Sequence, residues 1–177
     1  MKILILSWRC IKNPAAGGSE LYFHELAKSW IESGHEVVWF SPIFPNAKKT
    51  EKCEGVEIIR KGNRLSVYFF AFLYYILGKL PSDFDVVIDV ENGIPFFSPL
   101  YMRNKNIMLH IQHIHKDVWR REFSFPISWI GLFLETKIMP IIYKKNKVIT
   151  ISKSSAAEIT ESGISSFNPL IVNPGIE

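Results

Sequence analysis

Short apolar runs rich in β-branched residues recur along the whole chain and are separated by polar turns. Most of these runs are continuously apolar rather than alternating, as expected for strands that are buried on both faces of a parallel sheet. We expect seven strands, which cover residues 2–7, 36–40, 56–60, 85–90, 106–111, 147–151 and 170–172.

Helical periodicity fills many of the intervals between these strands. At residues 19–33 the apolar side chains recur at spacings of three and four, which gives one apolar helix face. Further helices are expected at about 65–79, 95–102, 127–144 and 154–162. Strands that alternate with helices predict the α/β class, with a Rossmann-like, doubly wound, mostly parallel seven-stranded sheet.

Turn and cap residues support the helix boundaries. Gly34 and Gly163 follow apolar helical patterns, at positions where a left-handed backbone favours a residue without Cβ. Ser155 and Glu158 have the spacing of a capping box, which predicts that Ser155 caps the helix at 154–162.

Two adjacent glycines, Gly17 and Gly18, lie between the first strand and the first helix. Such a loop lets a ligand approach the backbone closely, and the helix behind it offers free N–H groups to a phosphate or a sugar hydroxyl. The glycines could equally serve only to permit a tight turn. A third glycine at the dinucleotide-binding spacing is missing, which argues against a dinucleotide-dependent dehydrogenase.

Three histidines follow or end the strand at 106–111, at the edge where α/β sheets bind ligands. On an extended backbone His113 and His115 share a face, and His110 takes the other face. One well-placed imidazole suffices for a general base or a hydrogen bond to a sugar. A metal site needs three or four convergent ligands, and no carboxylate or cysteine is obviously paired with these histidines, so no metal is predicted.

Polar residues also follow the strand at 85–90. Asp89, Glu91, Asn92 and Gly93 are candidates to bind sugar hydroxyls, although Asn-Gly is also a common turn. The D-x-D pattern at residues 83–85 leads into the strand itself, so a turn and strand entry is the favoured reading over a metal site.

The overall composition is that of a packed domain with a mild positive charge. The 177 residues are 47% hydrophobic and carry a net charge of +4, with scattered rather than clustered basic residues. We therefore expect no nucleic-acid partner, whereas an anionic substrate or membrane surface fits the charge. Two cysteines are too few for a disulfide framework, and no signal peptide is visible, which favours the cytoplasm.

Two segments are unusually apolar. Residues 65–80 are too short to span a bilayer, and we expect either a helix buried on all sides or one that lies on a membrane surface. Residues 123–133 form a second apolar segment and follow Trp119, Arg120 and Arg121. Together they motivate the expectation of peripheral membrane contact.

The ordered set of motifs resembles the N-terminal half of glycosyltransferase family 4 enzymes, which have the GT-B fold. The segments that carry the resemblance cover nearly the whole chain: KILILS, NPAAGGSELYFHELAKSWIESGHEVVWFS, DFDVVIDVENG, HIQHIHKDVW, LETKIMPIIYKKNKVITISKSSAAEI and LIVNPGIE. The resemblance implies two Rossmann-like domains that face each other across a cleft. It also implies transfer of a sugar from a nucleotide-sugar donor to an acceptor, with retained anomeric configuration and without a metal or other cofactor.

Site residues follow from the same resemblance. Gly17 and Gly18 match the glycine loop near the donor phosphate and the acceptor, and His113 best matches the active-site histidine that contacts the transferred sugar. His110 or His115 could hold that place instead. Ser152 and Lys153 match the serine-rich turn near the cleft.

The family's second, nucleotide-binding domain has no counterpart in these 177 residues, since the sequence stops at Glu177, where its interdomain linker would begin. We expect residues 1–177 to be one acceptor-side domain that is inactive by itself. The acceptor would be a glycan or a lipid-linked sugar. Two alternatives stay open: half of a nucleotide-sugar 2-epimerase, with Glu91 and Asp117 as its carboxylates, and a non-catalytic module that binds a glycan or lipid headgroup.

Overall fold

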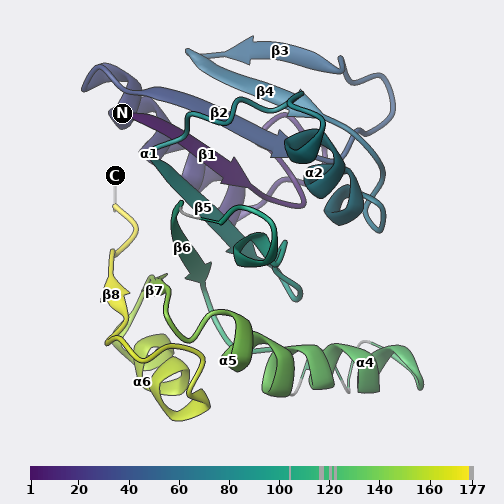
Figure 1. The fold of residues 1–177 in the computed structure, drawn as a ribbon, viewed down its shortest axis with the longest axis vertical. Coiled ribbons are helices and arrows are strands. Elements are labelled where there is room, and N and C mark those ends of the chain that lie inside the picture. Colours follow the sequence, from purple (N-terminus) through teal and green to yellow (C-terminus); the bar gives the residue numbers. More distant parts are fainter. Residues whose placement is uncertain (104, 116–117, 120, 122, 176–177) are drawn as a thin grey trace.

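A computed structural model describes residues 1–103, 105–115, 118–119, 121 and 123–175. Within them, eight strands form one sheet in the order β3-β4-β2-β1-β5-β6-β7-β8 (Figure 1). The strands are β1 (Lys2–Leu6), β2 (Glu36–Ser41), β3 (Thr50–Cys53), β4 (Val56–Arg60), β5 (Val86–Glu91), β6 (Asn106–Ile111), β7 (Lys147–Thr150) and β8 (Leu170–Ile171).

The predicted α/β class and mostly parallel sheet are confirmed. Neighbouring strands pair in parallel throughout, except that β3 runs antiparallel to β4. The expected count of seven strands is wrong by this one element. β3 has the sequence TEKC and lies at the edge of the sheet, so it lacks the apolar run that marks a strand buried on both faces.

Helices connect most of the strands. They are α1 (Gly18–Glu32), α2 (Val67–Ile76), the 3₁₀ turn η1 (Ser98–Leu100), α4 (Ile127–Phe133), the π-helix η2 (Leu134–Ile138), α5 (Met139–Ile142) and α6 (Lys153–Ser162). The helix predicted at 95–102 is therefore only a single 3₁₀ turn. The one predicted at 127–144 is a continuous rod of α4, η2 and α5.

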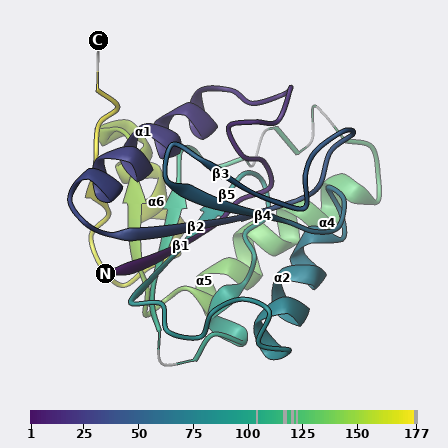
Figure 2. The same cartoon turned by 90° about the horizontal axis from the view of Figure 1, so that it is seen from above.

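Alternate residues of the strands supply two different cores. Ile3 and Ile5 pack with Phe23 and Ala27 of α1, whereas Leu4 and its neighbours on the other face pack with α2. Figure 2 shows α1 and α2 on opposite sides of the strands. A third core joins β6 and β7 to α5 and α6. The continuous apolar runs are thus explained by burial on both faces.

Helix ends agree with the sequence at the glycines and differ at one cap. Gly34 has φ +83°, and the His35 and Gly34 amides donate to the carbonyls of Trp30 and Ile31 in a Schellman arrangement. Gly163 ends α6 in the same left-handed backbone region. The cap of α6 is Ser152 rather than the predicted Ser155, because the Ser152 hydroxyl accepts from the Ser155 amide at 3.1 Å.

The two aspartates of the D-x-D pattern hold the amino edge of the sheet. Asp83 pairs with the Lys2 ammonium at 3.1 Å, and the Asp85 carboxylate accepts the Lys2 amide at 2.7 Å. These contacts join the start of β1 to the start of β5, which agrees with the expected role in strand entry.

Helix α2 is not buried on all sides. Val67 and Ala71 lie in the core, but Phe69 is 60% exposed and Ile76 is 58% exposed. The reading of this segment as a fully buried helix is therefore wrong. Among the described residues, no helix is both long and apolar enough to cross a bilayer.

Candidate functional site

The site lies at the carboxyl edge of β5 and β6. Glu91 ends β5, and the histidines follow β6 after Ile111. The imidazole rings of His113 and His115 are 4.3 Å apart between centroids, and His115 Nδ1 lies 3.3 Å from a carboxylate oxygen of Glu91. The predicted shared face of the two histidines is confirmed, and we call Glu91, His113, His115 and Glu135 the histidine rim.

Glu135 completes the histidine rim from the π-helix η2. Its carboxylate accepts the backbone N–H of His115 and also lies 3.9 Å from His115 Nδ1. Sequence reasoning missed this residue, because a π-helical turn shifts the side chains out of the α-helical period. The available sequence signal was a single acidic residue inside a long, mostly apolar stretch. In the structure, the Glu135 side chain is 2% exposed.

The two rim histidines have opposite protonation preferences. Burial lowers the pKa of His115, but the neighbouring Glu91 and Glu135 carboxylates outweigh burial and raise it above the ordinary value. Burial and the charge of His115 lower the pKa of His113. The two carboxylates thus favour a proton on His115, whereas the neighbouring His113, which is open to solvent, favours the neutral imidazole.

The rim also has the composition of a cation site. The ligand atoms of Glu91, His115 and Glu135 lie within 4.8 Å of one another. Against this use, Glu135 already accepts the His115 amide, and His115 fits its two carboxylates as a charged donor. A second group with metal-binding composition consists of His24, Cys53 and Glu54 and lies on the other side of β1, at the hairpin of β3 and β4.

Asp89 positions the loop after β5 rather than a sugar. It is fully buried, and its carboxylate accepts hydrogen bonds from the Phe96 and Ser98 amides, the Ser98 hydroxyl and the Tyr143 hydroxyl. Both oxygens are thus engaged inside the protein, which corrects its assignment as a sugar ligand.

Asn92 and Gly93 begin this loop at the rim. Asn92 is half-buried, and its amide nitrogen has no hydrogen-bond partner among the described residues. A Cβ at Gly93 would lie 3.4 Å from the Trp119 ring, and one at Gly131 would lie only 2.3 Å from it. Trp119 is therefore packed between two glycines and is 7% exposed, so it does not face a membrane.

Gly17 and Gly18 do not serve the turn. Gly17 has φ −131°, which any residue can adopt, and Gly18 is the first residue of α1. A Cβ at Gly17 would make only an ordinary contact with Glu20, and one at Gly18 would meet nothing within 4 Å. Neither the backbone angle nor the packing requires glycine at these two positions, and Gly17 is the N-cap of α1.

Glu20 already occupies part of the α1 N-terminus. Its buried carboxylate accepts the Gly17 amide at 2.7 Å, and its other oxygen lies 3.3 Å from Arg9. A groove of about 610 Å³ runs along α1 from Gly18 to Lys28 and is closed on its other side by residues 173–175. None of the histidine rim lines this groove.

Three sequence candidates lie apart from the rim. His110 is 1% exposed and packs against Phe23 and Tyr22 of α1, away from the pair of His113 and His115. Ser152 caps α6 with its hydroxyl, and Lys153 is exposed in the first turn of that helix. Asp117 and Arg120 lie outside the described residues.

The turn into α6 is nevertheless tied to the rim segment. The Ser155 hydroxyl donates to the Gln112 carbonyl at 2.6 Å, and Gln112 directly precedes His113. This hydrogen bond joins the first turn of α6 to the segment that follows β6.

Comparison with known proteins decides the family. The profile of Glycosyltransferase Family 4 matches residues 16–177. The chain belongs to glycosyltransferase family 4. This family assignment confirms the resemblance on which Gly17, Gly18 and His113 were chosen as site residues, whereas the roles of these residues stay predictions.

A solved structure shows the same fold for this glycosyltransferase domain. Sucrose-phosphate synthase from Thermosynechococcus elongatus superimposes with a TM-score of 0.69 at 16% sequence identity, over 99% of this chain and 48% of that chain. The domain thus has the fold of a GT-B half and spans about half the length of this solved relative. No curated protein sequence matches the chain.

The burial of His110 predicts a specific acid sensitivity. Burial lowers the pKa of His110 from 6.5 to about 4, so between these values the unfolded chain binds a proton that the folded chain does not. Stability should fall by about 3 kcal/mol as the pH is lowered from 6.5 to 4, at about 1.4 kcal/mol for each pH unit. Urea unfolding as a function of pH measures this slope.

The matched variants are His110→Leu, which cannot titrate, and His35→Gln, which removes a histidine at the amino edge of the sheet. His110→Leu should flatten the slope between pH 6.5 and 4, and His35→Gln should leave it in place. An unchanged slope in His110→Leu would assign the acid sensitivity to other groups.

Proposed function

We propose that this domain is the acceptor-binding half of a retaining glycosyltransferase, which transfers a sugar from a nucleotide-sugar donor to a glycan or lipid-linked acceptor. The observation that carries the proposal is the histidine rim, where Glu91, His113 and His115 gather at the carboxyl edge of a parallel sheet. Membership in glycosyltransferase family 4 supports the class of reaction. The donor is a substrate, and the proposal requires no cofactor or metal.

His113 is the residue proposed to act on the transferred sugar. It is exposed at the rim, and its lowered pKa keeps one ring nitrogen free to accept a hydrogen bond at neutral pH. A neutral imidazole can hold a sugar hydroxyl in place while positive charge develops on the sugar ring. Asn92 and Lys153 are proposed to contact the substrates at the border of the same edge.

His115 is proposed to position His113 and to supply charge. The Glu91 carboxylate is 1% exposed, and an unpaired buried carboxylate would be costly, so His115 is held as its counter-ion. A proton on His115 would place positive charge beside His113, at the edge where a departing phosphate would carry negative charge.

The empty space at Gly17 and Gly18 is proposed to receive the donor phosphate or the acceptor. The N-terminus of α1 carries a positive partial charge, and a ligand without an intervening Cβ can approach its amides closely. Arg9 lies beside this terminus, where it pairs with Glu20.

The glycine hypothesis separates activity from stability. Gly18→Ala should leave the domain as stable as wild type or more stable by up to about 1 kcal/mol, because alanine favours a helix and its Cβ meets nothing. The same variant should lower the transfer rate at least about tenfold if a substrate fills that space. Thermal unfolding and transfer from radiolabelled UDP- and GDP-hexoses to a lipid extract, with the enzyme that carries this domain, measure the two effects.

Gly34→Ala is the control, since Gly34 also has no neighbour within 4 Å but lies at the opposite end of α1 with φ +83°. It should lower stability and leave transfer unchanged. Wild-type transfer by Gly18→Ala would remove the glycine loop from the substrate site.

Replacement of His113 tests the rim directly. His113→Ala should lower kcat by one or more orders of magnitude with little change in stability, because an exposed side chain that contacts substrate is lost. His35→Ala, at the amino edge of the sheet, should retain wild-type kcat. An unchanged kcat in His113→Ala would exclude His113 from the mechanism. Separately, identification of the product anomer by NMR tests whether the anomeric configuration is retained.

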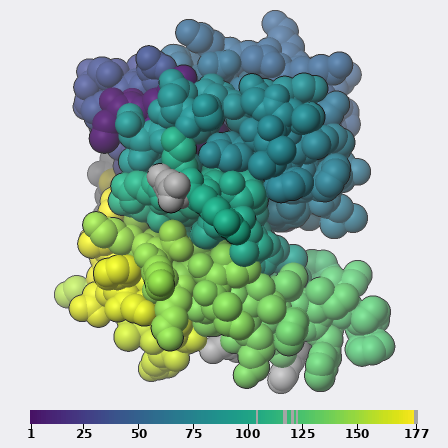
Figure 3. Space-filling view, in the orientation of Figure 1, coloured from purple at the N-terminus to yellow at the C-terminus, as the bar shows by residue number. Residues whose placement is uncertain are grey.

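A lipid-linked acceptor is favoured by the apolar surface beside this edge. Leu65, in the turn before α2, and Phe69, Phe72 and Ile76 of α2 follow one another at spacings of three and four and are 40–87% exposed. On α4, Ile127, Trp129, Ile130 and Phe133 are 50–69% exposed. Both helices stand on the same side of the molecule in Figures 1 and 3. We call these eight residues the apolar flank.

We propose that the apolar flank rests on an anionic membrane at the cytoplasmic face. Basic residues border it at Lys61, Arg64, Lys79, Arg121 and Lys137, which complements an anionic surface. Both cysteines are free and buried, as is usual in a reducing compartment. Contact through this flank would bring a lipid-linked acceptor to the carboxyl edge, since α2 and α4 follow the carboxyl ends of β4 and β6.

Liposome flotation tests the membrane contact. The chain should float with vesicles that contain phosphatidylglycerol, less so at high salt, and the Phe69→Glu/Trp129→Glu double variant should bind at least about tenfold more weakly. Lys52→Glu, on the far edge strand β3, changes the charge by the same two units as the double variant and should retain binding. Equal flotation of the double variant and wild type would exclude the apolar flank as the contact surface.

A further inference from the structure

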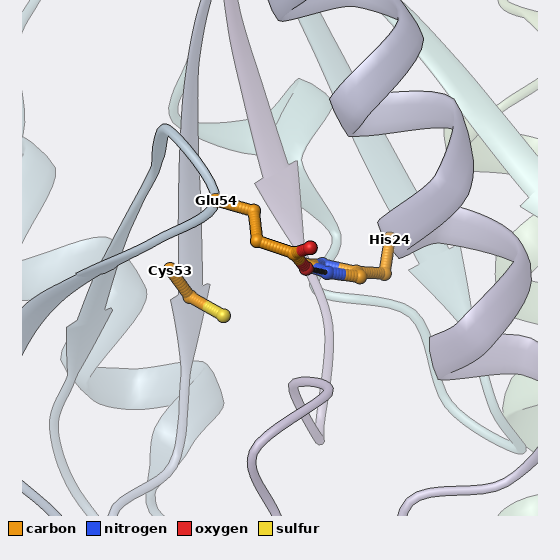
Figure 4. Close-up of side chains that lie close together, drawn as sticks. All are labelled: His24, Cys53 and Glu54. Atoms are coloured by element: carbon orange, nitrogen blue, oxygen red, sulfur yellow. Dashed lines mark hydrogen bonds and ion pairs between the residues drawn. The ribbon is translucent and has the colours of Figure 1, made fainter.

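A second cluster of chemically reactive side chains lies between α1 and the hairpin of β3 and β4. Figure 4 shows that His24, on α1, points toward Glu54 and that the Cys53 sulfur is directed toward the same space. His24 Nε2 contacts a carboxylate oxygen of Glu54. His24 is 4% exposed and Cys53 is 8% exposed, so two of the three groups are enclosed by protein.

The three side chains offer the ligand types of a zinc site. One ligand atom from each residue, a thiol sulfur, an imidazole nitrogen and a carboxylate oxygen, lies within 4.8 Å of the others. Ligand atoms of tetrahedral zinc lie about 3.6 Å apart, given bonds of about 2.0–2.3 Å. Side-chain rotation would therefore have to bring the more distant atoms closer by up to about 1 Å and separate His24 Nε2 from the Glu54 oxygen that it contacts, so that one ion fits between them.

The backbone at the hairpin turn holds Glu54 in an unusual conformation. Cys53 pairs with Val56 across the hairpin, and the two residues between them, Glu54 and Gly55, have φ +48° and +87°. Such a turn ordinarily carries Asn, Asp or Gly at its first central position, and a glutamate there costs about 1 kcal/mol. The geometry of the turn does not favour a glutamate at this position. Its long side chain, however, reaches His24 on α1, as a metal ligand would have to.

Packing keeps the turn close to α1. A Cβ at Gly55 would lie 2.9 Å from the Ile31 side chain, so the hairpin approaches the helix as closely as a glycine allows. Ile31 and His24 are seven residues apart and therefore lie on the same face of the helix. This contact fixes the height of Cys53 and Glu54 relative to His24.

The charges around the cluster are compatible with a bound cation. One oxygen of the Glu54 carboxylate contacts His24 Nε2. Lys28 lies 3.8 Å from the other Glu54 oxygen and is itself paired with Glu25 at 3.3 Å. The His24 Nδ1 atom has no hydrogen-bond partner among the described residues, so only its Nε2 contact orients the ring.

We propose that His24 Nε2, Cys53 Sγ and the Glu54 carboxylate bind one zinc ion, with a water molecule as the fourth ligand. Thiolate and imidazole together select zinc over magnesium or calcium, which prefer oxygen ligands. On binding, the Cys53 thiol loses its proton to solvent and the ion replaces the His24–Glu54 contact. The ion links α1 to the β3–β4 hairpin, far from the histidine rim.

Metal titration of the 177-residue chain tests the site. After treatment with a chelator, Zn²⁺ should bind at one equivalent in competition with a chromophoric chelator, and should raise the unfolding temperature. Co²⁺ should give a thiolate charge-transfer band and intense visible bands, the signature of a tetrahedral site with sulfur. Cys53→Ser and His24→Gln should each weaken Zn²⁺ binding at least about tenfold and abolish or shift these bands.

Cys10→Ser is the matched control, because Cys10 is the other free cysteine and contacts Arg60 instead. It should retain binding and the Co²⁺ spectrum. In the unmodified protein, Zn²⁺ should slow alkylation of Cys53 at least about tenfold and leave Cys10 unaffected, which tests the site without any variant. Less than one equivalent of zinc, an unprotected Cys53, or equal binding by Cys53→Ser would each overturn the proposal.

Discussion

The buried carboxylate of Asp89 is the interaction on which the site depends. A charge without solvent costs several kcal/mol unless its oxygens are satisfied. Here four donors from two segments meet it: the Phe96 and Ser98 amides and the Ser98 hydroxyl from the loop after β5, and the Tyr143 hydroxyl from the end of α5. Removal of any one donor would leave an oxygen of the buried carboxylate with fewer hydrogen bonds and would lower the stability of the fold. The loop after β5 and the helical rod after β6 are therefore fixed with respect to each other, and the histidine rim lies between them.

Burial and neighbouring charges then give the three histidines of residues 110–115 different pKa values. The alternation of a strand sends His110 under α1, where its ring stays neutral, and leaves His113 and His115 on the other side. Within this pair, the carboxylates of Glu91 and Glu135 favour charge on His115, and that charge in turn disfavours a proton on His113. One short segment thus holds a buried neutral ring at His110, a ring that favours a proton at His115 and an exposed ring that favours the neutral form at His113.

The sequence predicted those parts of the structure that local patterns encode. Continuous apolar runs located the parallel strands, and strand alternation placed His113 and His115 together. β3 was missed because an edge strand that is half in water needs no apolar run, as TEKC illustrates. Glu135 was missed because its position depends on a π-helical turn, and the Ser152 cap because neighbouring serines at 152, 154 and 155 offer the same hydroxyl.

Properties of the site that depend on tertiary contacts could not be predicted from the sequence alone. The neutral or charged state of each histidine depends on which carboxylate lies beside it, and Glu91 and Glu135 are 44 positions apart. The function of Gly17 and Gly18 was likewise open, because a turn and a ligand site both favour glycine. The backbone angle of Gly17 and the open space above Gly18 show that the turn does not require glycine, and the ligand site stays a prediction.

The two edges of the sheet differ in how well their groups are satisfied, and this contrast is itself an argument about function. At the amino edge, Lys2 is bound by Asp83 and Asp85, and Gly34 closes α1 with a complete set of amide bonds. At the carboxyl edge, an ion pair is buried, the space above Gly18 is open, and aromatic side chains face outward. Each of these features lowers stability or solubility relative to an ordinary alternative. Their concentration on one edge is expected where substrates, rather than the protein itself, complete the contacts.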